Sequence, residues 1–165
     1  LLFLIFVMVL IIMGMGEVYY TMMVYFGSSR RPAAWAMLLS QYVFLVEQLI
    51  ILFVVAALVE NNECMKAVRA CPLGIIAILF TLAGIGHLVN AISLSGYKIC
   101  AGILAFSLAF ISMIVLAIFG TTFEMGAEML IPYNNIWILL AGLAVAVIGA
   151  IVYFKTVTRA DLKLA

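Results

Sequence analysis

Long apolar runs separated by short polar stretches divide the chain into five segments. A helix needs about 20 residues to cross a hydrocarbon core of about 30 Å, and each run is long enough to do so. The runs are continuously apolar, whereas the strands of a membrane barrel alternate apolar and polar residues over about ten positions. The pattern therefore predicts an all-α membrane protein, with a single transmembrane helical domain over residues 1–165. The expected spans are residues 1–26, 33–59, 72–94, 99–119 and 135–154.

Polar turns mark the limits of the runs. Pro32 follows a Gly-Ser-Ser-Arg-Arg sequence, and Pro72 follows a charged stretch over 60–71 that we interpret as a loop. Proline is well tolerated in the first turn of a helix, so both residues are expected to stand at helix starts. The longest connection covers residues 121–134, and its apolar residues predict a short helix lying in the membrane interface.

Basic residues are shared unequally between the two ends of the predicted bundle. Five spans put most of the Lys and Arg residues on one side of the membrane. That side holds Arg30, Arg31, Lys98, Lys155, Arg159 and Lys163, and the other holds Lys66 and Arg69. Short loops rich in Lys and Arg remain cytoplasmic. We therefore expect a cytoplasmic C-terminus and an outside start of the first helix, in a multi-pass protein of a plasma or inner membrane.

The composition supports lipid as the surrounding medium. The chain is 69% hydrophobic and 9% charged, whereas about a quarter of the residues in a soluble domain are charged. The formal net charge of +1 provides no basic face for phosphate groups, which nucleic-acid binding requires. The expected partner is therefore the lipid bilayer, and nucleic acid is excluded.

Four of the polar residues inside the predicted spans form a candidate intramembrane cluster. They are Glu17, Glu47, His87 and Asn90. An ionised side chain at the bilayer centre costs about 2.5–3.5 kcal/mol on insertion scales, so such residues mark candidate sites. Two interpretations remain open. The cluster forms a proton or cation relay or a polar pocket, or it ties helices together and meets a basic residue of a partner subunit.

No catalytic or metal motif accompanies the cluster. The chain has a single histidine and lacks the HExxH and CxxC spacings of metal sites. We also find no nucleophile–base pair. The chain is therefore expected to be neither an enzyme nor a cofactor or metal carrier. Cys64 and Cys71 share one predicted outer connection, where an oxidising exterior permits a disulfide; two free thiols are the alternative.

Small residues recur at four-residue spacing along the last two predicted spans. These helix-packing candidates are Ala101, Ala105 and Ala109 in one span, and Gly142, Ala146 and Ala150 in the other. Small residues let helix backbones approach closely in lipid, so these stripes bind either each other or another chain.

Three functions follow from these patterns. The leading expectation is a small accessory or structural subunit of a larger integral membrane complex, in contact with other membrane subunits or with copies of itself. One alternative is a small oligomeric transporter or proton-conducting module that uses Glu17, Glu47 and His87. The other is the membrane sensor segment of a signalling protein, suggested by the basic C-terminal tail.

Overall fold

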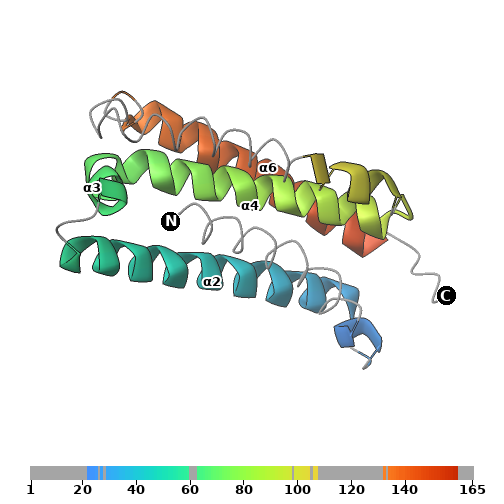
Figure 1. Cartoon of the computed structure of the whole chain (residues 1–165). Helices are drawn as coiled ribbons and strands as arrows, with labels where there is room; N and C mark the ends of the chain where they lie inside the picture. Colours follow the sequence, from blue (N-terminus) through green and yellow to red (C-terminus); the bar gives the residue numbers. More distant parts are fainter. Residues whose placement is uncertain are drawn as a thin grey trace.

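The computed structural model describes residues 22–25, 27, 29–59, 63–97, 99–104, 106–107, 132 and 134–159. All regular structure within these ranges is helical. The main elements are α2 (Arg30–Leu58), α3 (Glu63–Ala70), α4 (Pro72–Leu94) and α6 (Ile136–Arg159) (Figure 1). Helices α2, α4 and α6 are each long and apolar enough to cross a membrane. This confirms the all-α, membrane-type character predicted from the sequence.

The three long helices coincide with three of the predicted spans. The bounds of α4 match the prediction, and α2 begins three residues before the predicted start at residue 33. Helix α6 continues past residue 154 to Arg159. Hydropathy detects only the apolar part of a helix, whereas Lys and Arg at its end extend their charged groups into the interface and let the backbone stay helical. The spans predicted over 1–26 and 99–119 lie mostly outside the described residues, as does the interfacial helix over 121–134.

The charged stretch before α4 is not the loop that we predicted, because α3 occupies Glu63–Ala70. A helix of this length is marginal alone and needs tertiary contacts. Val68 supplies one, since its side chain is fully buried, while Lys66 and Arg69 remain exposed. Met, Lys, Ala and Arg are good helix formers, and this composition was the signal that the loop interpretation overlooked.

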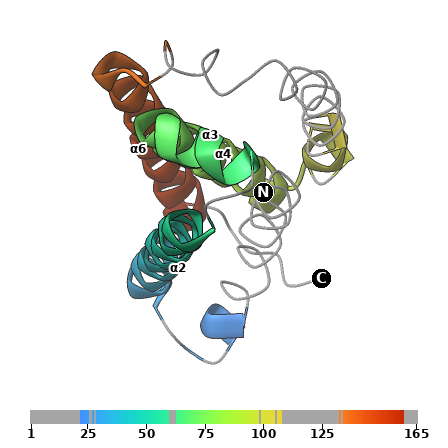
Figure 2. The same ribbon diagram turned by 60° about the vertical axis from the view of Figure 1, so that its left-hand side comes forward.

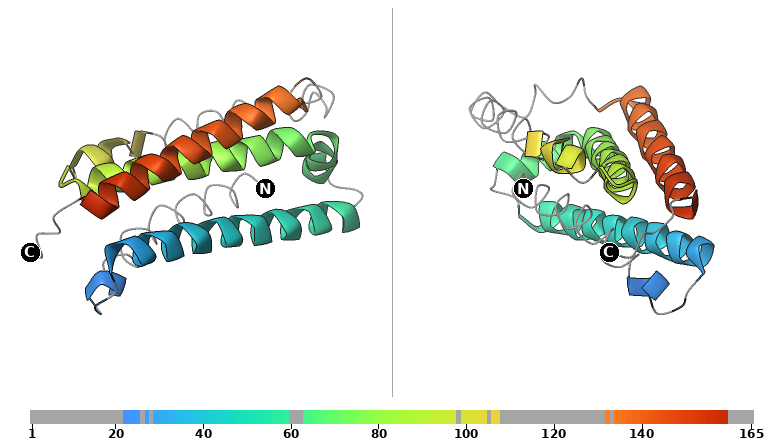
Figure 3. Two further views of the ribbon diagram at one scale, coloured as in Figure 1. Left: turned by 180° about the vertical axis from the view of Figure 1, so that it is seen from behind. Right: turned by 90° about the vertical axis from the view of Figure 1, so that its right-hand side faces the viewer.

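Helices α4 and α6 run parallel and lie side by side (Figures 1 and 3). The residue order along their contact shows the direction, because Gly142 adjoins Ala77 and Gly149 adjoins Gly84. At the start of both helices, the Leu73 N–H donates a hydrogen bond of 3.0 Å to Asn134 Oδ1. This bond satisfies one of the amide groups that the first turn of α4 leaves without an intrahelical partner.

Glycine permits the close approach of α4 and α6. A methyl group built on Gly84 would lie 2.8 Å from the Cα of Ala146, and one built on Gly149 would lie 2.8 Å from the Cα of Gly84. Both obstacles are backbone atoms, which cannot rotate away as a side chain can. The two backbones are therefore packed against each other, as small residues allow in membrane helices.

Helix α2 crosses this pair in the antiparallel direction (Figure 2). Its first turns pack against the ends of the other two helices, where Ala34 and Met37 share a buried cluster with Ala91 of α4 and Tyr153 of α6. Further along, Leu45 and Leu49 pack against Leu79 and Ala83 of α4. The core is therefore thin and lies between α2 and the α4–α6 pair.

Candidate functional site

His87 of α4 lies where the three long helices meet. Only 1% of its surface is exposed. Its ring is flanked by Tyr42 of α2, with ring centroids 5.5 Å apart, and by Tyr153 of α6, at 5.7 Å. Aromatic side chains from two other helices therefore enclose the imidazole, which places it out of contact with water and lipid.

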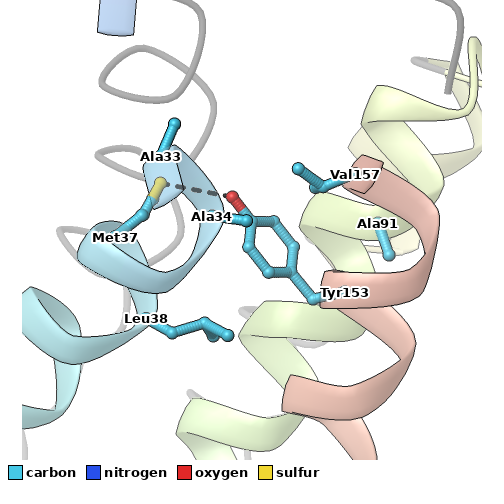
Figure 4. Close-up of a cluster of buried hydrophobic side chains, with 7 residues drawn as sticks. All are labelled: Ala33, Ala34, Met37, Leu38, Ala91, Tyr153 and Val157. Carbon is cyan, nitrogen blue, oxygen red and sulfur yellow. Dashed lines mark hydrogen bonds between the residues drawn. The ribbon is translucent and has the colours of Figure 1, made fainter. Parts of the chain in front are cut away.

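The hydroxyl groups of both tyrosines reach across to another helix. Tyr42 donates a hydrogen bond of 3.1 Å to the carbonyl oxygen of Ala146 on α6. Tyr153 donates one of 3.2 Å to the sulfur of Met37 on α2. Figure 4 shows the Tyr153 ring extending from α6 toward α2, with its hydroxyl directed at Met37. The two bonds connect α2 and α6 beside His87, one with its donor on α2 and the other with its donor on α6.

Asn90 lies one turn after His87, and its side chain is also buried, at 3% exposed. Residues three apart lie on the same face of a helix. Neither ring nitrogen of His87 nor the Nδ2 of Asn90 has a hydrogen-bond partner among the described residues. We call His87, Asn90, Tyr42 and Tyr153 the buried polar layer. Gln41, next to Tyr42 on α2, is buried as well.

The buried polar layer has unused hydrogen-bonding capacity. Buried polar groups are nearly always paired, and leaving one unpaired costs about 1–3 kcal/mol. Imidazole has one donor and one acceptor nitrogen when neutral, and two donors when protonated. The groups available for chemistry here are therefore the two imidazole nitrogens of His87 and the side-chain amide of Asn90. Within the described ranges, no three His, Cys, Asp or Glu side chains gather as a metal site would require.

The structure places Glu47 on the opposite side of α2 from the core. Leu45 and Leu49, two residues before and after it, face α4. Two residues correspond to a rotation of about 200° around a helix, so the Glu47 side chain points away from this contact. It is exposed, and no hydrogen bond or ion pair joins it to a described residue. Glu47 and His87 are therefore not brought together, and Glu17 lies outside the described residues.

The predicted small-residue stripe of α6 lies largely in its contact with α4. Gly142 and Ala146 are buried there, and Ala150 is partly buried beside the cluster that contains Tyr153. In the preceding segment Ala101 is buried, and Ala105 and Ala109 lie outside the described residues. Gly84 and Gly149 were not among the predicted packing residues, because they do not belong to a stripe with four-residue spacing of the kind found in the last two predicted spans. The contact instead repeats every seven residues, with Ala77 and Gly84 facing Gly142 and Gly149.

The Cys64–Cys71 disulfide stays a prediction, and the helical geometry of α3 opposes its formation. Cys71 is a buried, free thiol, and the side chain of Cys64 lies outside those described. Helix α3 contains residue 64 and ends at Ala70, directly before Cys71. At a rise of about 1.5 Å per residue, the Cα atoms of residues 64 and 71 are about 10 Å apart along its axis. A disulfide needs Cα atoms within about 7 Å, so α3 would have to unwind for the bond to form.

The site as a whole combines an enclosed polar layer with one carboxyl group on the outer face of α2. Comparisons of the chain with protein-family models, with characterised proteins and with solved structures find no match.

Proposed function

We propose that this chain is a non-catalytic accessory subunit of a larger integral membrane assembly. The observation that carries the proposal is the position of Glu47, an exposed carboxyl group with Val43, Val46 and Ile50 exposed around it. A carboxylate facing hydrocarbon costs a few kcal/mol. A partner helix that hydrogen-bonds the carboxyl group removes this cost. The exposed face of α2 is therefore expected to bind a protein helix in preference to lipid.

Five spans with a cytoplasmic C-terminus form part of the proposal. Helices α4 and α6 run parallel, so a chain that crosses the membrane in both must return across it between them. The apolar run over residues 99–119 is long enough for that return. Among the described residues, Arg30 and Arg31 begin α2, and Lys155 and Arg159 end α6. The antiparallel packing puts these four at one end, which supports a cytoplasmic location for it.

The test is native mass spectrometry of the tagged full chain, extracted gently from its own membrane. We expect the chain to be recovered with other integral membrane chains in a fixed ratio. Glu47→Ala should release the chain that covers this face of α2, whereas the matched control Val46→Ala, on the same exposed side of α2, should retain it. Interhelical polar contacts in membranes contribute about 0.6–2 kcal/mol, so the expected loss is about three- to thirtyfold in affinity. Recovery of a lone monomer would contradict the proposal.

A second function is favoured by the buried polar layer. A proton-conducting module needs a titratable group with free hydrogen-bonding capacity inside the membrane, and His87 has two ring nitrogens without a described partner. Proton flux into proteoliposomes, followed with a pH-sensitive dye, tests this directly. His87→Phe keeps an aromatic ring in place but cannot carry a proton, so conduction that survives in this variant would exclude the relay.

A further inference from the structure

We propose that the partner covering Glu47 is a second copy of this chain, with α2 packed in parallel against the α2 of that copy. The inference rests on the proposed function, which requires a protein partner at this face, and it names that partner. Three features of α2 support it: the spacing of its exposed residues, the chemistry of Glu47 and the location of the basic residues.

The exposed residues around Glu47 follow a heptad repeat. Steps of three and four residues connect six exposed positions, which we call the α2 seam. The α2 seam consists of Ser40, Val43, Glu47, Ile50, Val54 and Ala57. A repeat of alternating three and four residues keeps one stripe of a helix against a partner helix along a left-handed crossing, the commonest geometry in membrane bundles. From residue 40 to residue 57 the α2 seam covers about 26 Å, most of a hydrocarbon core.

The composition of the α2 seam suits close helix packing. β-Branched side chains lie on both sides of Glu47, with Val43, Ile50 and Val54 each more than half exposed, at 59%, 59% and 52%. The residues at the two ends are small, which lets the helices approach. The hydroxyl of Ser40 already donates a hydrogen bond of 2.8 Å to the carbonyl oxygen of Met37. Glu47 is therefore the one seam residue that needs a polar partner.

A second copy supplies that partner at the required depth. In a two-fold symmetric pair, a residue on the axis faces itself, and both copies have the same orientation in the membrane. A protonated carboxyl group offers a donor and an acceptor, so two Glu47 side chains satisfy each other. A single polar residue in an apolar heptad seam also fixes register and oligomeric state.

The described part of the chain offers no cation for this position. Its basic residues lie at the ends of the helices or on α3, and Arg30, at the start of α2, is 17 residues away, or about 25 Å along the helix axis. An ion pair between Arg30 and Glu47 of one copy would therefore need a side chain far longer than arginine. Pairing of like carboxyl groups between copies avoids this requirement.

Photocrosslinking in the native membrane tests the inference. Benzoylphenylalanine replaces Val43, Ile50 or Val54 in the full chain, one position at a time, and Val46 serves as the control because it is exposed at 47% but lies outside the α2 seam. We expect adducts of twice the chain mass from the seam positions and at least about fivefold less from residue 46. Equal yields of this adduct at all four positions would show that the α2 seam is not the surface through which two copies pack.

Other adducts separate this inference from the proposed function. Mass spectrometry that identifies a different polypeptide at the seam positions would overturn the second copy and leave the accessory-subunit proposal standing. Adducts with lipid alone would overturn both. A second comparison isolates the carboxyl group: Glu47→Gln, which keeps a donor and an acceptor, should retain the crosslinked dimer, whereas Glu47→Val should lower its yield about three- to tenfold. Equal yields in the two variants would show that Glu47 does not pair.

Discussion

At the scale of single residues, His87 fits its surroundings by shape more than by hydrogen bonding. The rings of Tyr42 and Tyr153 enclose the imidazole, while both its nitrogens lack a partner among the described residues. Apolar replacement of an unpaired polar group at constant shape is close to neutral. Removal of a buried ring, in contrast, leaves a cavity whose cost grows with its volume.

These two costs predict different changes in stability for two substitutions at residue 87. His87→Phe should change the free energy of unfolding by less than about 1 kcal/mol. His87→Ala should lower it by about 2–4 kcal/mol. Unfolding titrations with sodium dodecyl sulfate in mixed micelles provide the measurement. Equal losses of stability in the two variants would mean that the ring nitrogens form stabilising hydrogen bonds. His87 would then contribute to stability through hydrogen bonding and not only through the packing of its ring.

Cys71 provides a second prediction at this scale. Burial raises the pKa of its thiol, although a hydrogen bond with the backbone of Gly74 opposes the shift. A higher pKa means less reactive thiolate at a given pH. At pH 8 we therefore expect Cys71 to be alkylated at least about tenfold more slowly than Cys100, which is exposed. Peptide mass spectrometry after timed alkylation measures both rates.

Prior reduction serves as the control for Cys71. Slow alkylation that is unchanged by a reductant agrees with a buried free thiol. If Cys71 reacts only after reduction, the Cys64–Cys71 disulfide exists and α3 does not persist in the oxidised protein. In dodecyl sulfate all free thiols should react at similar rates, because unfolding removes the burial.

At the scale of elements, the contact between α4 and α6 depends on the absence of side chains. Gly84→Ala places a methyl group against the backbone of Val145 and Ala146, so one helix must move. Such overpacking costs about 1–3 kcal/mol. The matched control is Gly102→Ala, where a methyl group meets nothing within 4 Å. There the higher helix propensity of alanine should leave stability unchanged or raise it by up to about 1 kcal/mol.

Thermal unfolding in detergent compares these two glycine variants. The prediction requires a clear loss of stability in Gly84→Ala and none in Gly102→Ala. Gly149→Ala faces Gly84 across the same contact and should resemble Gly84→Ala. Equal stability of all three variants would show that α4 and α6 are not in backbone contact.

How far the sequence predicts these elements depends on which physical signal each one has. A long apolar run identifies α4 to the residue, because lipid selects for length and hydrophobicity together. The same signal ignores α3, whose polar residues resemble a loop, and the end of α6, where basic residues continue the helix. For the candidate site, hydropathy places His87 and Glu47 within spans but does not fix the rotation of each helix. Only the packed structure separates His87, facing the core, from Glu47, facing outward.

At the scale of the whole molecule, the directions of the helices constrain how the chain threads the membrane. The start of α4 and the start of α6 lie at the same end, joined by the hydrogen bond between Leu73 and Asn134. The turn that follows α4, with Gly96 at a φ of +92°, lies at the other end. If both helices span the bilayer, residues 97 and 132 must face opposite compartments.

Cysteine accessibility in intact cells tests this threading. Single cysteines replace Lys66, Tyr97 or Pro132, all exposed, after the three native cysteines have been changed to serine. A membrane-impermeant maleimide should label residues 66 and 132 from outside. It should label residue 97 only after permeabilisation, because basic residues keep that end in the cytoplasm. Labelling of residues 97 and 132 from the same side would mean that one of the two helices does not cross. Labelling of residue 97 from outside, and of residues 66 and 132 only after permeabilisation, would keep the crossings between these positions but invert the orientation. The presence of these crossings and their direction are therefore tested separately.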